Sequence, residues 1–171
     1  KVKHHYSVRE SRYQGLHRAL VKAYGDQTLS VMSRSTDGKD MILRASSDTN
    51  PGSIFIFNTE AKRAEFFWAN RSWMDPNQMR PMRIDEVISR DGFSIPVRLT
   101  LPATDEPAPL IVNPHGGPHG ISDDWAFNYE TQMLASRGYA VLQVNFRGSG
   151  GFGKKFEDAG HMEWGGKMIE D

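Results

Sequence analysis

The 171-residue chain has no cysteine, no net charge and no long apolar run, and each absence narrows what it can be. Without thiols it forms neither disulfides nor thiolate metal sites. Its 21 basic and 21 acidic residues cancel, which argues against binding to nucleic acid or to an anionic membrane surface. No apolar run approaches the roughly 20 residues of a membrane-spanning helix. The remaining composition, with 38% hydrophobic and 25% charged residues, is typical of a core-forming globular protein.

The first part of the chain predicts a helix followed by an antiparallel sheet. Apolar residues recur at helical spacing from Tyr13 to Tyr24, and Gly25 follows as a stop signal. Four short apolar or β-branched runs separated by turn sequences then predict strands at residues 28–35, 40–47, 53–59 and 64–69. Such a meander has the size of one β-propeller blade. We expect the aromatic residues near its end to belong to the core: Phe66, Phe67, Trp68 and Trp73.

The second part of the chain predicts the opening of a parallel sheet. Residues 76–83 contain two prolines and no clear period, which indicates a linker. Two apolar runs, at 84–90 and 94–102, flank an Asp-Gly pair and predict a hairpin. The runs 110–115 and 139–146 are apolar on both faces, as in buried strands.

A helix is predicted between these last two strands, from about Trp125 to Arg137. Asp123 or Asp124 would cap its start and Gly138 would end it, with Met133 and Leu134 on its apolar side. A strand, a helix and a strand with short connections form a βαβ unit, and therefore a parallel pair.

The sequence HGGPHG directly follows the predicted strand at 110–115. In acyl transfer the carbonyl oxygen gains negative charge, and N–H donors must already point at it. Glycines after a strand let the backbone turn sharply and present its amides without a Cβ in the way. Gly116 and Gly117 are therefore candidates for an oxyanion hole, and a Gly-Pro turn without chemical function is the alternative.

The sequence GSGGFG at 148–153 matches the G-x-G-x-x-G pattern of dinucleotide-binding folds. Arg147, Lys154 and Lys155 flank it, whereas the helix in that motif opens with small apolar residues, and Gly160 interrupts the helix that follows. We therefore interpret this stretch as a surface loop beside an active-site rim and expect no nucleotide cofactor.

The histidines do not predict a metal site. His4 and His5 are adjacent near the start of the chain, and Gly-Gly-Pro separates His115 from His119, so no helix places these two on one face. His161 has Glu157 four residues before it but no third ligand near it in the sequence. We therefore expect no metal.

Three motifs in a fixed order carry a resemblance to a known family: SRDGFSIPVRLTLP, PLIVNPHGGPHG and LASRGYAVLQVNFRGSGGFGKKFEDAGHMEWGGKMIED. Together they resemble the prolyl oligopeptidase family of serine peptidases, most closely its acylaminoacyl-peptidase and dipeptidyl-peptidase branch. The resemblance implies the last part of an all-β propeller at residues 1–75, a linker at 76–83, and the start of an α/β-hydrolase catalytic domain with a mixed, mostly parallel sheet at 84–171.

The resemblance also implies a function, the cleavage of short peptides by a Ser-His-Asp triad. HGGP matches the oxyanion-hole segment, so Gly116 and Gly117 carry over, with the Gly117 amide as the expected donor. Arg147 and the glycines after it match a loop near the cavity, to which we assign no chemical role. The nucleophile of the family lies beyond GGKMIED, so the triad is expected after Asp171. Ser149 is not expected to be the nucleophile, because no glycine stands two residues before it.

Lys1 stands where a complete chain has Met, and we expect the chain to be an inactive segment of a longer enzyme. Two other functions stay open, a non-catalytic binding module on the same scaffold and a carboxylesterase with the same oxyanion hole. A propeller favours the peptidase because it filters substrates by size. The expected partners are short peptide substrates, and we expect binding neither to nucleic acid nor to a membrane. Whether the protein forms a homo-oligomer stays open. The expected location is cytoplasmic.

Overall fold

The computed structural model describes residues 18, 21, 22, 24, 25, 27–117 and 119–171. They form two compact units, and the chain passes from one to the other between Met79 and Arg80, inside the segment predicted as a linker. That segment contains a short 3-10 helix, η1 (Pro76–Gln78). Of the helix predicted over 13–24, residues 18, 21, 22 and 24 are helical and the others lie outside the described part. No helix in the described part is long and apolar enough to cross a membrane.

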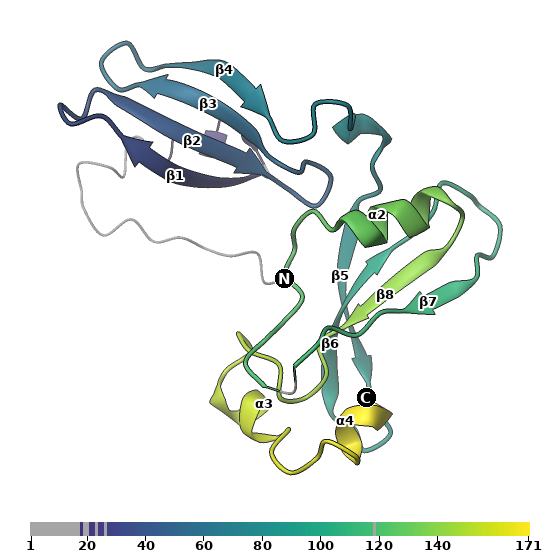
Figure 1. Cartoon of the computed structure of the whole chain (residues 1–171). Helices are drawn as coiled ribbons and strands as arrows, with labels where there is room; N and C mark the ends of the chain where they lie inside the picture. The colour runs from purple at the N-terminus through teal and green to yellow at the C-terminus, as the bar shows by residue number, and fades with distance from the viewer. Residues whose placement is uncertain (1–17, 19–20, 23, 26, 118) are drawn as a thin grey trace. The chain divides into compact units, whose positions relative to one another are not determined.

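The first unit is an antiparallel sheet whose four strands pair in chain order, as the sequence predicts (Figure 1). Its strands are β1 (Thr28–Arg34), β2 (Asp40–Ser46), β3 (Ser53–Asn58) and β4 (Arg63–Ala69). The β1–β2 turn forms where Gly38 takes a φ of +73° and the Asp37 carboxylate accepts a hydrogen bond from the Lys39 N–H at 3.1 Å. Met41, Leu43 and Phe57 form the buried core of this sheet.

The aromatic residues of β4 are exposed, so their predicted place in the core is wrong. Phe66, Phe67 and Trp68 are each more than half exposed, as is Trp73 in the following turn. The reason is positional, because among the described strands β4 pairs with β3 alone and is therefore an edge strand. Periodicity indicates which residues are apolar but not which strand lies at the edge of a sheet.

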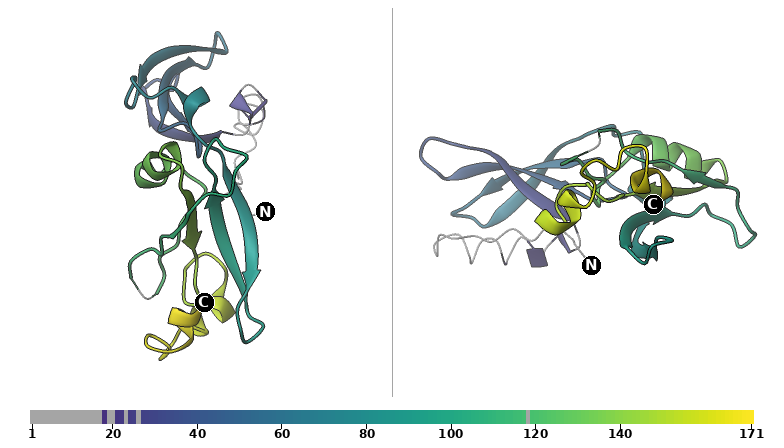
Figure 2. Two further views of the ribbon diagram at one scale, coloured as in Figure 1. Left: turned by 90° about the vertical axis from the view of Figure 1, so that its right-hand side faces the viewer. Right: turned by 90° about the horizontal axis from the view of Figure 1, so that it is seen from below.

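The second unit is built on a mixed sheet in the order β5–β6–β8–β7. β5 (Met82–Ile88) and β6 (Ser94–Thr100) form the predicted hairpin, β8 (Ala140–Val144) is antiparallel to β6, and β7 (Leu110–Val112) is parallel to β8. The helix α2 (Tyr129–Ser136) connects β7 to β8, which confirms the βαβ unit. The short helices α3 (Lys154–Asp158) and α4 (Lys167–Glu170) follow β8 and lie at the opposite end of this unit from α2 (Figures 1 and 2).

β7 is not the buried strand that its composition predicts. It has only three residues, and Leu110 and Val112 are each 56% exposed. β7 is the edge strand of the described sheet, with β8 as its one partner. β8, which lies inside the sheet, is buried as predicted, with Val141 fully covered.

The helix α2 is shorter than predicted and buries a different face. It begins at Tyr129, so neither Asp123 nor Asp124 caps it. Its buried residues are Thr131, Gln132 and Ala135, whereas Met133 is 51% exposed. The Gln132 side chain explains why this face of α2 is the buried one. Its amide pairs with the backbone N–H and carbonyl of Arg80 at 2.8 and 2.7 Å. Gly138 ends the helix as predicted, with a φ of +92°.

A buried arginine connects three segments of the second unit. Arg147, which is 3% exposed, donates two hydrogen bonds to Asp91 at 2.8 and 3.0 Å and two to Asp171 at 2.7 and 2.6 Å. Asp91 lies in the tip of the β5–β6 hairpin, which is close to the C-terminus in Figures 1 and 2. The guanidinium also lies 4.7 Å from the ring of Phe93. One side chain therefore fixes the hairpin tip, the loop after β8 and the last residue of the chain.

Because of this ion pair, the stability of the folded protein is expected to fall at acid pH as Asp91 becomes protonated. Hydrogen bonds from Arg147 lower the pKa of Asp91 to about 2, against about 3.9 for a free Asp. A lowered pKa means that the contribution of Asp91 is fully present above about pH 4 and is lost as the pH falls through 2. We therefore predict that Asp91→Asn lowers the melting temperature at pH 7 and that this deficit shrinks between pH 4 and 2.

The control is Asp85→Asn on β5, whose carboxylate is 55% exposed and lies 3.5 Å from Arg83. It should shift the melting temperature little at any pH, because exposed pairs contribute little. A deficit of Asp91→Asn that is the same at pH 7 and pH 2 would contradict the assigned ion pair.

Candidate active site

The HGGP turn leaves β7 and presents two exposed glycines. Gly117 has a φ of +83°, a conformation that glycine adopts without strain. A Cβ at this position would lie 2.6 Å from the Cδ1 atom of Ile121. Within the described part of the chain the Gly117 N–H has no hydrogen-bond acceptor. The turn therefore offers an exposed backbone donor.

The GSGG loop after β8 is buried, so its predicted place on the surface is wrong. Gly148, Ser149 and Gly150 are all buried, together with Arg147 before them. Glycine permits this burial through close backbone contacts. A Cβ on Gly150 would lie 2.5 Å from the carbonyl oxygen of Gly120, and a Cβ on Gly160 would lie 2.6 Å from the Cα of Gly148. These glycines thus serve backbone packing, and the helix that follows, α3, has only five residues.

Two backbone hydrogen bonds connect the two glycine-rich loops. The Gly120 N–H donates to the Gly148 carbonyl at 3.1 Å, and the Gly150 N–H donates to the Ile121 carbonyl at 3.0 Å. The loops meet because they follow β7 and β8, whose carboxyl ends lie at one edge of the sheet. In open α/β sheets this edge is where ligands bind.

A serine and a histidine from the two loops are in contact. Nε2 of His115 lies 2.9 Å from Oγ of Ser149, and that Oγ lies 2.6 Å from the carbonyl oxygen of Phe146. A carbonyl can only accept, so the hydroxyl donates its single proton to Phe146 and accepts from the Nε2–H of His115. A nucleophilic serine needs the opposite polarity, with the imidazole accepting the hydroxyl proton. Ser149 is also only 1% exposed, so this pair is not arranged as a catalytic dyad.

Asn145 fixes the segment that leads from the HGGP turn toward α2. Its side chain is fully buried, accepts a hydrogen bond from the Asp123 N–H at 2.7 Å and donates one to the Asp123 carbonyl at 3.1 Å. The Asp123 carboxylate accepts from Gln143 at 2.8 Å, and burial raises its pKa. Asp123 is thus part of the buried loop structure and not a helix cap.

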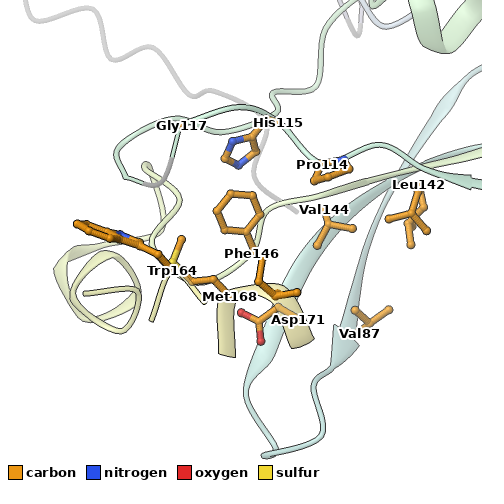
Figure 3. Close-up of a pocket in the computed structure, with 12 residues that line it drawn as sticks. Val87, Pro114, His115, Gly117, Leu142, Val144, Phe146, Trp164, Met168 and Asp171 are labelled. Carbon is orange, nitrogen blue, oxygen red and sulfur yellow. The ribbon is translucent and has the colours of Figure 1, made fainter. Parts of the chain in front are cut away.

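A cavity of about 580 Å³ opens beside the HGGP turn (Figure 3). Apolar side chains from three strands and from α4 form most of its wall, among them Val87, Val112, Val144 and Met168. His115 and Gly117 lie along its edge, and the His115 ring stacks on that of Phe146 at 4.5 Å. The cavity therefore combines an apolar wall with the exposed backbone of the predicted oxyanion turn.

The other histidines near this site make an aromatic cluster. The Trp164 indole N–H donates to Nε2 of His119 at 2.9 Å, and the rings of His119 and His161 are 4.9 Å apart. Among the described residues no three His, Cys, Asp or Glu side chains are grouped as metal ligands. His4 and His5 lie outside the described part.

Sequence reasoning missed the contact between Ser149 and His115 and the function of Arg147. One signal was available, because both glycine-rich loops directly follow strands that were predicted to be parallel neighbours. The carboxyl ends of such strands meet, so the polar residues of the two loops are brought together. A second signal is the spacing of Asn145, Arg147 and Ser149, three alternate polar residues that each bind a different segment.

Comparison with known proteins shows extended similarity to peptidases. The model of the Prolyl oligopeptidase family matches residues 125–171. Dipeptidyl aminopeptidase BIII of Pseudoxanthomonas mexicana is 36% identical over 160 residues, an alignment that covers 88% of this chain and 23% of that protein. Dipeptidyl peptidase family member 6 of Caenorhabditis elegans is 31% identical over 175 residues, an alignment that covers 89% of this chain and 24% of that protein. The chain thus spans about a quarter of the length of these relatives.

Solved structures extend the similarity to the fold. Pyrococcus horikoshii acylaminoacyl peptidase aligns with a TM-score of 0.62 and 25% identity, over 82% of this chain and 22% of that one. A puromycin-hydrolyzing peptidase of Mycobacterium tuberculosis aligns with a TM-score of 0.63 over 78% of this chain and 22% of that one. At 23% identity the second match supports the fold alone.

The close approach of the two loops can be tested at Gly150. Gly150→Ala places a Cβ against the Gly120 backbone, which cannot rotate away as a side chain can. Overpacking of this kind typically costs about 1–3 kcal/mol, so we expect a clear fall in melting temperature. The matched control is Gly165→Ala, where no atom lies within 4 Å of the new Cβ. Equal stability of the two variants would contradict the packing described for these loops.

Proposed function

Because the chain belongs to the prolyl oligopeptidase family, we propose that it is a segment of a serine peptidase and forms the oxyanion-binding side of the active site. The proposed substrates are short peptides, cleaved as by a dipeptidyl or acylaminoacyl peptidase. The names of the relatives support this substrate class. The chain spans about a quarter of those relatives, so the proposed activity is that of the longer protein.

The Gly117 N–H is the observation that carries the proposal. It lies on an exposed turn at the carboxyl end of a parallel strand, beside an apolar cavity, and without an acceptor in the described structure. When a nucleophile adds to a peptide carbonyl, the oxygen becomes negatively charged and requires a donor that is already in place. A backbone amide held by a folded turn meets this requirement without reorganising. Gly116 is the next candidate donor.

The nucleophile of this proposal lies outside the 171 residues. The chain contains no Gly-x-Ser-x-Gly, the turn in which an α/β hydrolase holds its nucleophilic serine. Ser149 is buried and donates its proton to a carbonyl, which opposes a nucleophilic role. We place the serine, the aspartate and the histidine of the triad after Asp171, in that chain order. The unpaired edge of β7 is compatible with a further strand there.

The first unit fits the proposal as the last part of a propeller. Its meander of four antiparallel strands has the topology of one blade, and its exposed aromatic residues on β4 leave an apolar edge. A complete propeller would filter substrates by size, admitting short peptides and excluding folded proteins.

The proposal predicts covalent labelling by a fluorophosphonate probe. In the full-length protein a single serine after position 171 should react, and mass spectrometry of the labelled peptide identifies it. The isolated 171-residue chain should not react, because it lacks a nucleophile and its base. Labelling of Ser149 in either sample would contradict the assignment.

Two substrates separate the proposed peptidase from the alternatives. A peptidase should hydrolyse a dipeptidyl p-nitroanilide as well as an activated ester, whereas a carboxylesterase should hydrolyse the ester alone. A protein that is neither labelled nor active on either substrate would be a binding module that retains only the scaffold. The heat-denatured protein is the control for non-specific labelling.

A further inference from the structure

We propose that Ser149 is a positioning residue for the oxyanion-binding turn and that it acts through His115, given the peptidase function proposed above. No chemical role was assigned to this loop on the basis of the sequence.

Ser149 is anchored twice on the same carbonyl. Both its N–H, at 3.0 Å, and its hydroxyl, at 2.6 Å, donate to the carbonyl oxygen of Phe146. The hydroxyl oxygen is therefore held in place with a lone pair free to accept the Nε2–H of His115 at 2.9 Å. Because Ser149 is 1% exposed, water cannot readily replace either partner.

The imidazole of His115 is thereby fixed at its edge and on its face. Ser149 holds Nε2, and the Phe146 ring stacks on the imidazole with an interplanar angle of 24°. The other nitrogen, Nδ1, lies 3.2 Å from the carbonyl oxygen of Gly116. With Nε2 held by Ser149, the ring keeps Nδ1 beside this oxygen and so limits the directions in which the Gly116 carbonyl can turn.

The carbonyl of Gly116 and the N–H of Gly117 belong to one peptide group. A peptide group is planar and trans, so its N–H points away from its C=O and the two rotate together. The contact of His115 with the Gly116 oxygen therefore restrains the direction of the Gly117 N–H. Ser149 influences that direction although it contacts neither glycine of the turn through its side chain.

The far end of the turn is held differently. The backbone hydrogen bonds from Gly120 to Gly148 and from Gly150 to Ile121 fix it to the loop after β8. Ser149 lies between the two glycines of that loop, so the near and far ends of the turn are fixed to one short segment. Removal of the Ser149 hydroxyl should free the near end and leave the far end in place.

The test compares steady-state kinetics of full-length variants on a dipeptidyl p-nitroanilide. Fluorophosphonate titration counts the competent active sites, so kcat is expressed per folded enzyme. Loss of a donor lowers rates by ~10²–10³, and a misplacement of about 1 Å can cost ~10², so Ser149→Ala should lower kcat by roughly 10- to 100-fold. KM should stay nearly constant, because the oxyanion forms only in the transition state. If the buried serine had a purely structural function, its removal would change the number of competent active sites but not the kcat of each site.

A double-mutant cycle identifies the route through His115. His115→Phe keeps a ring that can stack on Phe146 and removes the Nε2–H. If Ser149 acts through His115, this variant shows a similar loss, and the double variant is no slower than either single one. Ser122→Ala, a serine in the same pair of loops whose Oγ is 4.0 Å from the Cβ position of Gly151, is the matched control and should keep wild-type kcat.

The outcomes separate this proposal from the peptidase function itself. Wild-type kcat in Ser149→Ala, or losses that multiply in the double variant, would overturn the role of Ser149 while leaving the peptidase intact. If Ser149→Ala does not fold, His115→Phe decides, since wild-type kcat in that variant also overturns it. A wild-type enzyme that neither reacts with the probe nor cleaves the substrate would instead reject the proposed function.

Discussion

The ion pairs of Arg147 are the interaction on which the second unit most depends. A guanidinium that is 3% exposed must be fully paired, because an uncompensated buried charge costs several kcal/mol. The carboxylates of Asp91 and Asp171 neutralise this guanidinium from two directions, and the two residues belong to distant parts of the chain. Replacing such a triad by apolar residues can be neutral for stability, so we attribute to it a geometric function, which is to hold the hairpin tip, the loop after β8 and Asp171 together.

The same short segment positions the candidate active site. Asn145, Arg147 and Ser149 follow the buried strand β8, and each binds a different partner: the loop before α2, the two aspartates, and His115. Gly150, directly after Ser149, lets the backbone at Gly120, just after the HGGP turn, approach to contact. The buried strand β8 thus provides a rigid base. The three polar side chains that follow it fix the neighbouring loops on this base, and the Gly117 amide lies exposed on one of those loops.

The sequence predicts the parts of this structure that depend on local patterns. Strand positions follow from alternation and turn chemistry, and the parallel pairing of β7 and β8 follows from a short strand–helix–strand arrangement. The burial of Ser149 could not be predicted in the same way, because it depends on Gly120 and Gly160, which lie far away in the sequence. The exposure of Leu110 and Phe66 depends on which strands are edges, and a residue pattern carries no such information. Gly117 as an oxyanion donor comes from its motif and stays a prediction, whereas the contact between Ser149 and His115 required the fold.

The most direct test of the central claim is a crystal structure of the full-length protein after reaction with a peptidyl phosphonate. The phosphonyl oxygen of such an adduct occupies the position of the oxyanion in the transition state. The account predicts that the Gly117 nitrogen lies about 2.7–3.1 Å from that oxygen, the range of an oxyanion-hole donor. A phosphonyl oxygen held by other donors, with the Gly117 nitrogen beyond hydrogen-bond distance, would contradict the assignment of the HGGP turn as the oxyanion site.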